Sequence, residues 1–186
     1  AAILYRYGSE SYASIQDKVA QLTETAIQGI VDRYFEGLGP HDVPGRELEV
    51  VEYVFELVMD YGAYREFKRH RMQTYIPQQL TTNHGYIVPD LIDAVGLKSE
   101  FEHDMETAFE AESKLAGISN QVAQYVVTHA HLRRTLVKLN LRECFHLFKL
   151  RTQQSAHFTI RRVAFAALGA VQEVHPGLFK HLQLRD

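Results

Sequence analysis

Two basic, aromatic-rich segments hold the residues of this chain that are best suited to chemistry. The first reads YGAYREFKRHR and ends in Arg69, His70 and Arg71. The second reads NLRECFHLFKLR, from Asn140 to Arg151. Arginine can hold a phosphate through two parallel hydrogen bonds, and arginine or histidine can stack on a flat ring. The two segments therefore indicate a site for an anionic or heterocyclic ligand.

The basic triplet by itself also has a plainer interpretation. We expect it to close a helix that begins near Gly62, because cations complement the negative end of a helix dipole. Short basic runs are also common on solvated surfaces. Without the second segment, helix capping and solvation would be the preferred explanation.

The second segment is predicted to be a helix with Asn140 as its cap, running to about Leu150. Arg142 and His146 are four residues apart and share one face. Asn140 and Arg151 are three turns apart and lie along one line. The apolar residues of the segment are expected to face the core: Leu141, Phe145 and Phe148.

The remaining patterns predict one α+β domain over residues 1–186. Apolar spacing after a capping box at Ser14 predicts a helix to Phe35, and β-branched and aromatic residues favour a strand over 49–59. The other expected elements are loops over 37–45 and 72–89, a helix from Phe101 to Gly117, a short helix over 120–127, a strand over 128–139 and a long helix from Phe158 to His175-Pro176.

Composition excludes several classes of protein. With 186 residues and 46% hydrophobic content the chain can build one core, and a net charge of −3 argues against nucleic acid or an anionic membrane as a partner. The single cysteine, Cys144, excludes an internal disulfide and fits a cytoplasmic setting. His129 and His131 could pair on a metal, but no third ligand follows them, so we expect no metal site. A start without methionine suggests part of a longer, tandem protein.

In this order and at this spacing, the two segments resemble the flavin-dependent thymidylate synthase family, also called thymidylate synthase complementing protein, from about Glu47 to Ala167. The resemblance implies an α+β fold in which a small antiparallel sheet packs with several helices. It implies FAD binding by six residues: Arg69, His70, Arg71, Asn140, Arg142 and His146. Arg151 matches the family arginine that contacts dUMP and helps activate its pyrimidine, which makes it the implied catalytic residue.

The family reaction passes a methylene group from methylenetetrahydrofolate to dUMP, which yields dTMP, with reducing equivalents from NADPH carried by the flavin. Family members build each site from several subunits, so the resemblance implies a homo-oligomer or a sister domain as partner. The substrate positions implied here are Glu66, Gln79 and Arg151.

The departures from the family pattern are concentrated in the dUMP-binding stretch. Where the family reads Glu-x-Ser-x-Arg-Tyr, this chain has Pro77, Gln79, Thr81 and Thr82, and a further family arginine falls on Gln124. A family glutamine becomes Glu66, and the family's His-Glu-x-Pro-Phe-Glu-His stretch is reduced to 44–50. Each charge-assisted hydrogen bond lost costs on the order of 1.5–3 kcal/mol. Two hypotheses follow: an FAD-binding thymidylate synthase domain with an eroded dUMP motif, or an inactive copy that serves as an oligomerisation or scaffold domain.

Overall fold

A three-stranded sheet with the order β1-β3-β2 organises the chain, which a computed structural model describes over residues 1–186. The strands are β1 (Glu52–Asp60), β2 (Gln73–Pro77) and β3 (Leu132–Asn140). The amide of Leu141 bonds to the carbonyl of Val51 at 2.8 Å, and the amide of Tyr61 to that of His131 at 3.2 Å. The residue numbers in both pairs have the same sum, so β1 and β3 are antiparallel. The structure confirms the predicted α+β class.

The chain forms two compact units, and their boundaries fall within β1 and within β3. The first unit comprises residues 1–54 and 138–186, and the second comprises residues 55–137. No helix is both long and apolar enough to cross a membrane. Whether residues 1–186 behave as the single domain expected from the sequence stays a prediction.

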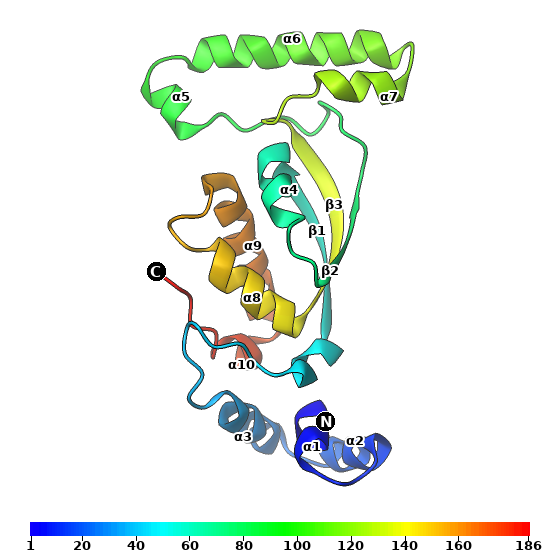
Figure 1. Ribbon diagram of the computed structural model, residues 1–186, viewed down its shortest axis with the longest axis vertical. Helices are drawn as coiled ribbons and strands as arrows, with labels where there is room; N and C mark the ends of the chain where they lie inside the picture. Colours follow the sequence, from blue (N-terminus) through cyan, green and yellow to red (C-terminus); the bar gives the residue numbers. More distant parts are fainter. The chain divides into compact units, whose positions relative to one another are not determined.

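The first unit is mostly helical. Its elements are α1 (Ala2–Tyr7), α2 (Tyr12–Ala20), α3 (Glu24–Phe35), the 3₁₀ turn η1 (Arg46–Val50), α8 (Leu141–Arg151), α9 (Phe158–Val174) and α10 (Pro176–Phe179). Helices α8 and α9 lie against each other (Figure 1). The Phe145 ring stacks on Phe35 at 5.2 Å and on Phe179 at 5.7 Å between centroids. This aromatic stack ties α3, α8 and α10 into one core.

The second unit joins the ends of the strands to a helical hairpin. Its elements are α4 (Tyr61–Phe67), α5 (Asp90–Ala94), α6 (Lys98–Ala116), α7 (Asn120–Ala123) and the 3₁₀ turn η2 (Gln124–Val126). The short α7 packs against the long α6, and both lie beyond the ends of the strands (Figure 1). The buried core of the second unit includes Met59, Phe67 and Met105.

Several predicted elements are confirmed, with small shifts at their ends. The structure contains the strand after residue 49, the helix that Gly117 ends, the short helix after Ser119, the strand before Asn140 and the long helix from Phe158. On α8, Leu141, Phe145 and Phe148 are buried, as the apolar spacing predicted.

Three predictions about element boundaries were wrong. The expected helix to Phe35 is two helices, because the Thr23 hydroxyl accepts a hydrogen bond from the Ala26 amide and starts α3 anew. The helix before the basic triplet ends at Phe67 rather than near Arg71, where a tighter turn takes over. The expected loop 72–89 contains β2, which pairing with β3 stabilises and no local pattern signalled.

Candidate functional site

The basic triplet lies in the turn after α4. The buried Asp60 starts this helix, because its Oδ1 accepts a hydrogen bond of 2.9 Å from the Ala63 amide. After Phe67 the chain turns, and Arg69 and Arg71 are exposed whereas His70 is 95% buried. The two guanidinium groups therefore reach solvent from a short, well-anchored turn.

The two arginines of the triplet differ in their pairing. Arg69 Nη2 lies 3.2 Å from Oε1 of Glu66, the carboxylate that replaces a family glutamine. Arg71 makes no ion pair in the structure. Glu66 thus offsets one cation of the triplet, and Arg71 remains the one available to an anion.

The segment that departs from the family pattern is held by a different set of contacts. The Gln124 side-chain carbonyl accepts a hydrogen bond of 3.0 Å from the Leu80 amide, next to Gln79. Arg133 Nε donates to the Gln78 carbonyl at 2.7 Å, and its guanidinium lies 4.7 Å from the Tyr64 ring centroid. Gln124 therefore fastens this loop, where the family has a cation for the substrate. The sequence pointed to no role for Arg133, and its only signal was a pair of arginines within a predicted strand.

On α8, two of the predicted ligand residues, Asn140 and Arg142, also make contacts that stabilise the fold. Asn140 caps the helix, with its Oδ1 accepting a hydrogen bond of 2.8 Å from the Glu143 amide. Arg142 donates to the Pro44 carbonyl at 2.9 Å and to Glu49 at 3.2 Å, so it holds the shortened segment 44–50 in place. His146 is exposed, and Arg151 is the last residue of the helix.

Lys149 is a buried cation that the sequence patterns missed. Its ammonium group donates to the carbonyls of Gly39 and Asp42 at 2.8 and 2.9 Å. Burial lowers the pKa of the Lys149 side chain, and the charge of Arg185 acts in the same direction. A lysine on the apolar face of a predicted helix was the signal that could have indicated this role.

The structure gathers the predicted site residues into two groups. Glu66, Arg69, His70 and Arg71 lie together at the end of α4, with Gln79 and Gln124 in or beside the following loop. Asn140, Arg142, His146 and Arg151 follow one another along α8. The first group belongs to the second unit and the α8 group to the first unit.

The histidine pair on the approach to β3 is divided between two environments. The His129 ring is exposed and lies 5.0 Å from the Tyr61 ring, whereas His131 is buried and its Nδ1 lies 2.9 Å from the Thr128 hydroxyl. The pair therefore does not present two imidazoles side by side to a metal ion.

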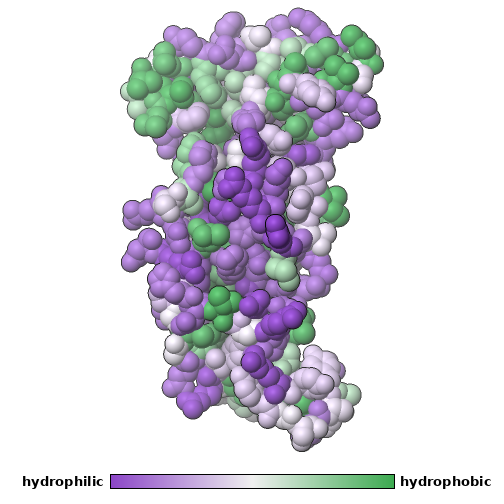
Figure 2. All heavy atoms as spheres, in the orientation of Figure 1, coloured by the Kyte–Doolittle hydropathy of each residue, from purple (hydrophilic) through white to green (hydrophobic).

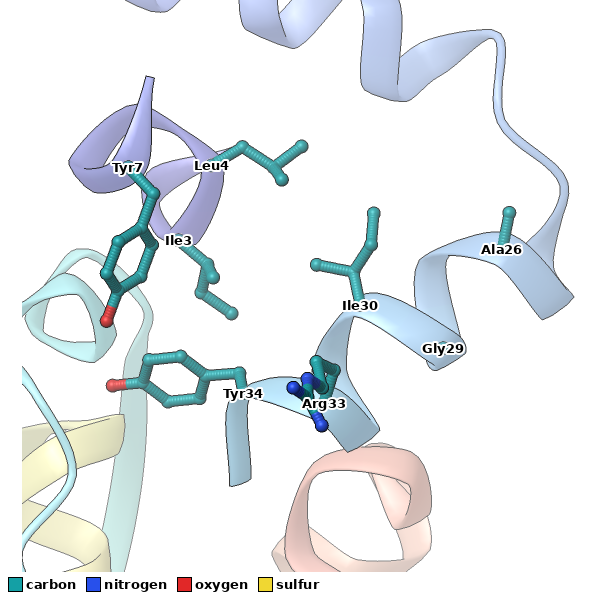
Figure 3. A pocket seen from close by; sticks show the side chains of 8 residues that line it. All are labelled: Ile3, Leu4, Tyr7, Ala26, Gly29, Ile30, Arg33 and Tyr34. Atoms are coloured by element: carbon teal, nitrogen blue, oxygen red, sulfur yellow. The ribbon is translucent and has the colours of Figure 1, made fainter. Parts of the chain in front are cut away.

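A hollow of about 550 Å³ lies between α1 and α3. Ile3 and Tyr7 from α1 point toward Ile30 and Tyr34 from α3 (Figure 3). The Tyr34 hydroxyl accepts a hydrogen bond of 2.8 Å from the Gly45 amide, and burial raises the pKa of this tyrosine. The lining is mainly apolar, and its one charged side chain, Arg33, is paired with Glu36.

Together, the α+β fold, the Asn-capped helix α8 and the Arg-His-Arg turn are the features by which the class of this protein can be recognised. The chain matches the family described as "Thymidylate synthase complementing protein" over residues 1–177, and it belongs to that family. The family is that of the flavin-dependent thymidylate synthases. The resemblance seen in the two segments is confirmed.

The curated relatives carry two kinds of name. The chain is 31% identical over 188 residues to a UPF0159 protein of Chlamydia muridarum, covering 100% of this chain and 35% of the relative. It is 33% identical over 139 residues to a UPF0159 protein of Thermoplasma acidophilum, covering 72% and 27%. A flavin-dependent thymidylate synthase of Nitratidesulfovibrio vulgaris is 28% identical over 128 residues, covering 61% and 52%. The chain thus spans about a third of the length of the UPF0159 relatives.

Proposed function

We propose that this chain is a flavin-binding domain of the thymidylate synthase type in which the dUMP-binding motif has been eroded. The observation that carries the proposal is Arg71, an exposed guanidinium without an ion pair, in the turn where the family grips its flavin. His70 and Arg69 flank it, and the amide nitrogen of Asn140 and the imidazole of His146 are the corresponding groups on α8.

The residues present fit FAD through their charge. Its pyrophosphate is dianionic, and guanidinium groups bind such an anion through charge-assisted hydrogen bonds. Arg71 and Arg69 would hold the pyrophosphate, with Glu66 weakening the contribution of Arg69. Arg142 would act indirectly, because its guanidinium is engaged with Pro44 and Glu49. When bound, the flavin supplies a carrier for the reducing equivalents of NADPH.

Flavin binding is tested with Arg71→Ala. We expect the full chain to quench flavin fluorescence on titration with FAD, and the variant to bind about tenfold more weakly because one charge-assisted contact is lost. Arg65→Ala is the matched control, since Arg65 is an exposed arginine on α4, just before the turn, and falls outside the triplet. Absence of saturable FAD binding by folded protein, or equal losses in both variants, would contradict the proposal.

Catalysis is a separate prediction. Neutral side chains at Thr81 and Gln124 replace two cations for the nucleotide, and Gln124 is already engaged with the backbone of the loop. We therefore expect no measurable dUMP-dependent NADPH oxidation or dTMP formation with methylenetetrahydrofolate. Robust turnover by the purified chain would overturn the eroded-motif proposal, whether or not that turnover required Arg151.

The second candidate function is that of an inactive copy that works by assembly. The observation in its favour is a set of exposed apolar side chains on the helices of the second unit and in the turns between them. In Figure 2 hydrophobic atoms gather over α5 and over the end of α6 with α7. The set comprises Leu91, Val95, Leu97, Ile118, Val122 and Tyr125. Such surfaces mark contacts with other chains, so they support a homo-oligomer or a sister domain as partner.

A further inference from the structure

A second hollow, of about 360 Å³, lies within the second unit between α6 and the segment 82–86. Its volume falls in the range of about 300–1,000 Å³ in which proteins bind small molecules. Eight residues line it: Thr82, Gly85, Tyr86, Glu102, Met105, Glu106, Phe109 and His131. Thr82 falls at the end of the stretch that matches the family's dUMP-binding motif, and the other seven lie outside the positions that the resemblance assigns to flavin or nucleotide.

The wall formed by α6 is acidic. Glu102 and Glu106 are one turn apart on the helix and line the hollow, and neither makes an ion pair in the structure. Like charges four residues apart destabilise a helix. This wall therefore carries two carboxylates whose repulsion a bound cation would relieve.

The floor holds a histidine with one ring nitrogen left for a ligand. His131 is 2% exposed and lines the hollow. Its Nδ1 lies 2.9 Å from the Thr128 hydroxyl, which also lies 3.3 Å from the sulfur of Met105. Burial lowers the pKa of His131, which keeps the ring neutral. Nε2 has no hydrogen-bond partner in the structure, and it is an acceptor when the neutral ring carries its proton on Nδ1.

A buried carboxylate near the hollow, that of Glu112, also lacks a cationic partner. Glu112 is 91% buried and accepts a hydrogen bond only from the Thr82 hydroxyl, at 3.3 Å. No cation of the chain pairs with it, although a buried carboxylate is costly without one. Since Thr82 and His131 both line the hollow, the charge of Glu112 adds to its negative potential.

The remaining lining suits the apolar part of such a cation. The Tyr86 ring meets His131 edge-on at 5.9 Å between centroids, and Phe109 is 48% exposed on the other wall. Aromatic rings attract cations and also pack against apolar stems. A bare metal ion fits less well, because Glu102, Glu106 and His131 do not bring ligand atoms within 4.8 Å of one another.

We propose that this hollow is a binding site for a small organic cation, a primary ammonium on an apolar or aromatic stem. The ammonium group lies at the acidic wall of Glu102 and Glu106, while the stem packs against Tyr86 and Phe109. The residues that carry the proposal lie on α6 and at Tyr86, none of which matches a flavin or dUMP position of the family, so it stands whether or not the chain binds either ligand.

The test is a calorimetric titration of the full chain with phenethylamine, beside the neutral 2-phenylethanol and the anionic phenylacetate. Only the ammonium compound is expected to bind saturably. Glu102→Gln and Glu106→Gln should each weaken it about three- to tenfold, because each removes one partly solvated charge contact. Glu100→Gln, on α6 but outside the lining, should leave the affinity unchanged. Circular dichroism checks that each variant is folded.

A second readout follows the site itself. The ring resonances of His131 should shift in nuclear magnetic resonance spectra on addition of phenethylamine and not of phenylacetate. Equal affinity for 2-phenylethanol, an equal effect of Glu100→Gln and Glu106→Gln, or no saturable binding of phenethylamine at millimolar concentration would each overturn the proposal.

Discussion

Arg71 and Arg142 carry the same charge and are used in different ways. Arg142 makes hydrogen bonds to Pro44 and Glu49, so removing it would disturb the protein itself. Arg71 is exposed and makes no ion pair, so its removal should leave folding intact. At the residue scale, this difference makes Arg71 the sharper probe of ligand binding.

The buried His131 predicts a pH dependence of stability. Its pKa in the folded protein lies below the ordinary value of about 6.5 because burial disfavours the charged ring, while the charge of Glu112 opposes part of that effect. Below that ordinary value the unfolded chain binds a proton more readily than the folded one, so the free energy of unfolding falls as the pH is lowered. We expect this loss on moving from neutral pH into the mildly acidic range.

The check is urea denaturation of the wild type and His131→Gln over that range. The variant should lose the part of the pH dependence that His131 contributes. His129→Gln is the matched control, because that ring is exposed and should leave the profile as it is in the wild type. Parallel profiles for the wild type and His131→Gln would contradict the assignment.

At the scale of elements, α8 serves as the fastening point for the loop that follows α3. Lys149 bonds to two carbonyls of that loop and Arg142 to a third, that of Pro44. The loop is rich in glycine and proline and has no regular structure of its own. Its shape therefore depends on cations of a helix about a hundred residues away in sequence.

Lys149→Met tests this role of α8. The substitution keeps the apolar stem and removes both hydrogen bonds, which leaves two carbonyls without their donor. We expect a loss of about 2 kcal/mol in the free energy of unfolding, measured with urea. Lys138→Met is the control, since Lys138 makes an exposed pair with Glu52 and should cost less than about 1 kcal/mol. Equal losses in the two variants would argue against the fastening role.

At the scale of the whole molecule, exposed apolar side chains on α5 to α7 predict self-association. Ile118 is 83% exposed and Leu91 79%, and both lie in the second unit. We expect sedimentation at tens of micromolar to show an oligomer, and Ile118→Glu to shift it toward the monomer because a charge would have to be desolvated in the contact. Val174→Glu, an exposed valine at the end of α9 in the first unit, is the control. A monomeric wild type would count against assembly through this surface.

Local patterns determined those parts of the fold whose cause is local. The Asn140 cap, the buried stripe of α8, the long helix from Phe158 and the strand with alternating Tyr53, Phe55 and Leu57 follow from capping and periodicity within a few neighbouring residues. The family, too, was readable from the sequence, because the triplet and the Asn-capped helix are local motifs whose order and spacing survive without the rest.

Only the tertiary structure decided which polar and charged side chains are already engaged in contacts within the chain. Three side-chain contacts join residues that are separated by between 44 and 110 positions in the sequence. They are the contacts of Arg142 with Glu49, of Gln124 with the Leu80 amide and of Lys149 with the Gly39 carbonyl. No sequence period encodes such contacts, because each depends on how strands and loops are brought together. The same holds for β2, which needs β3 as its partner, and for the hollow beneath α6. There Glu102 and His131 line one space only because the chain folds back between them.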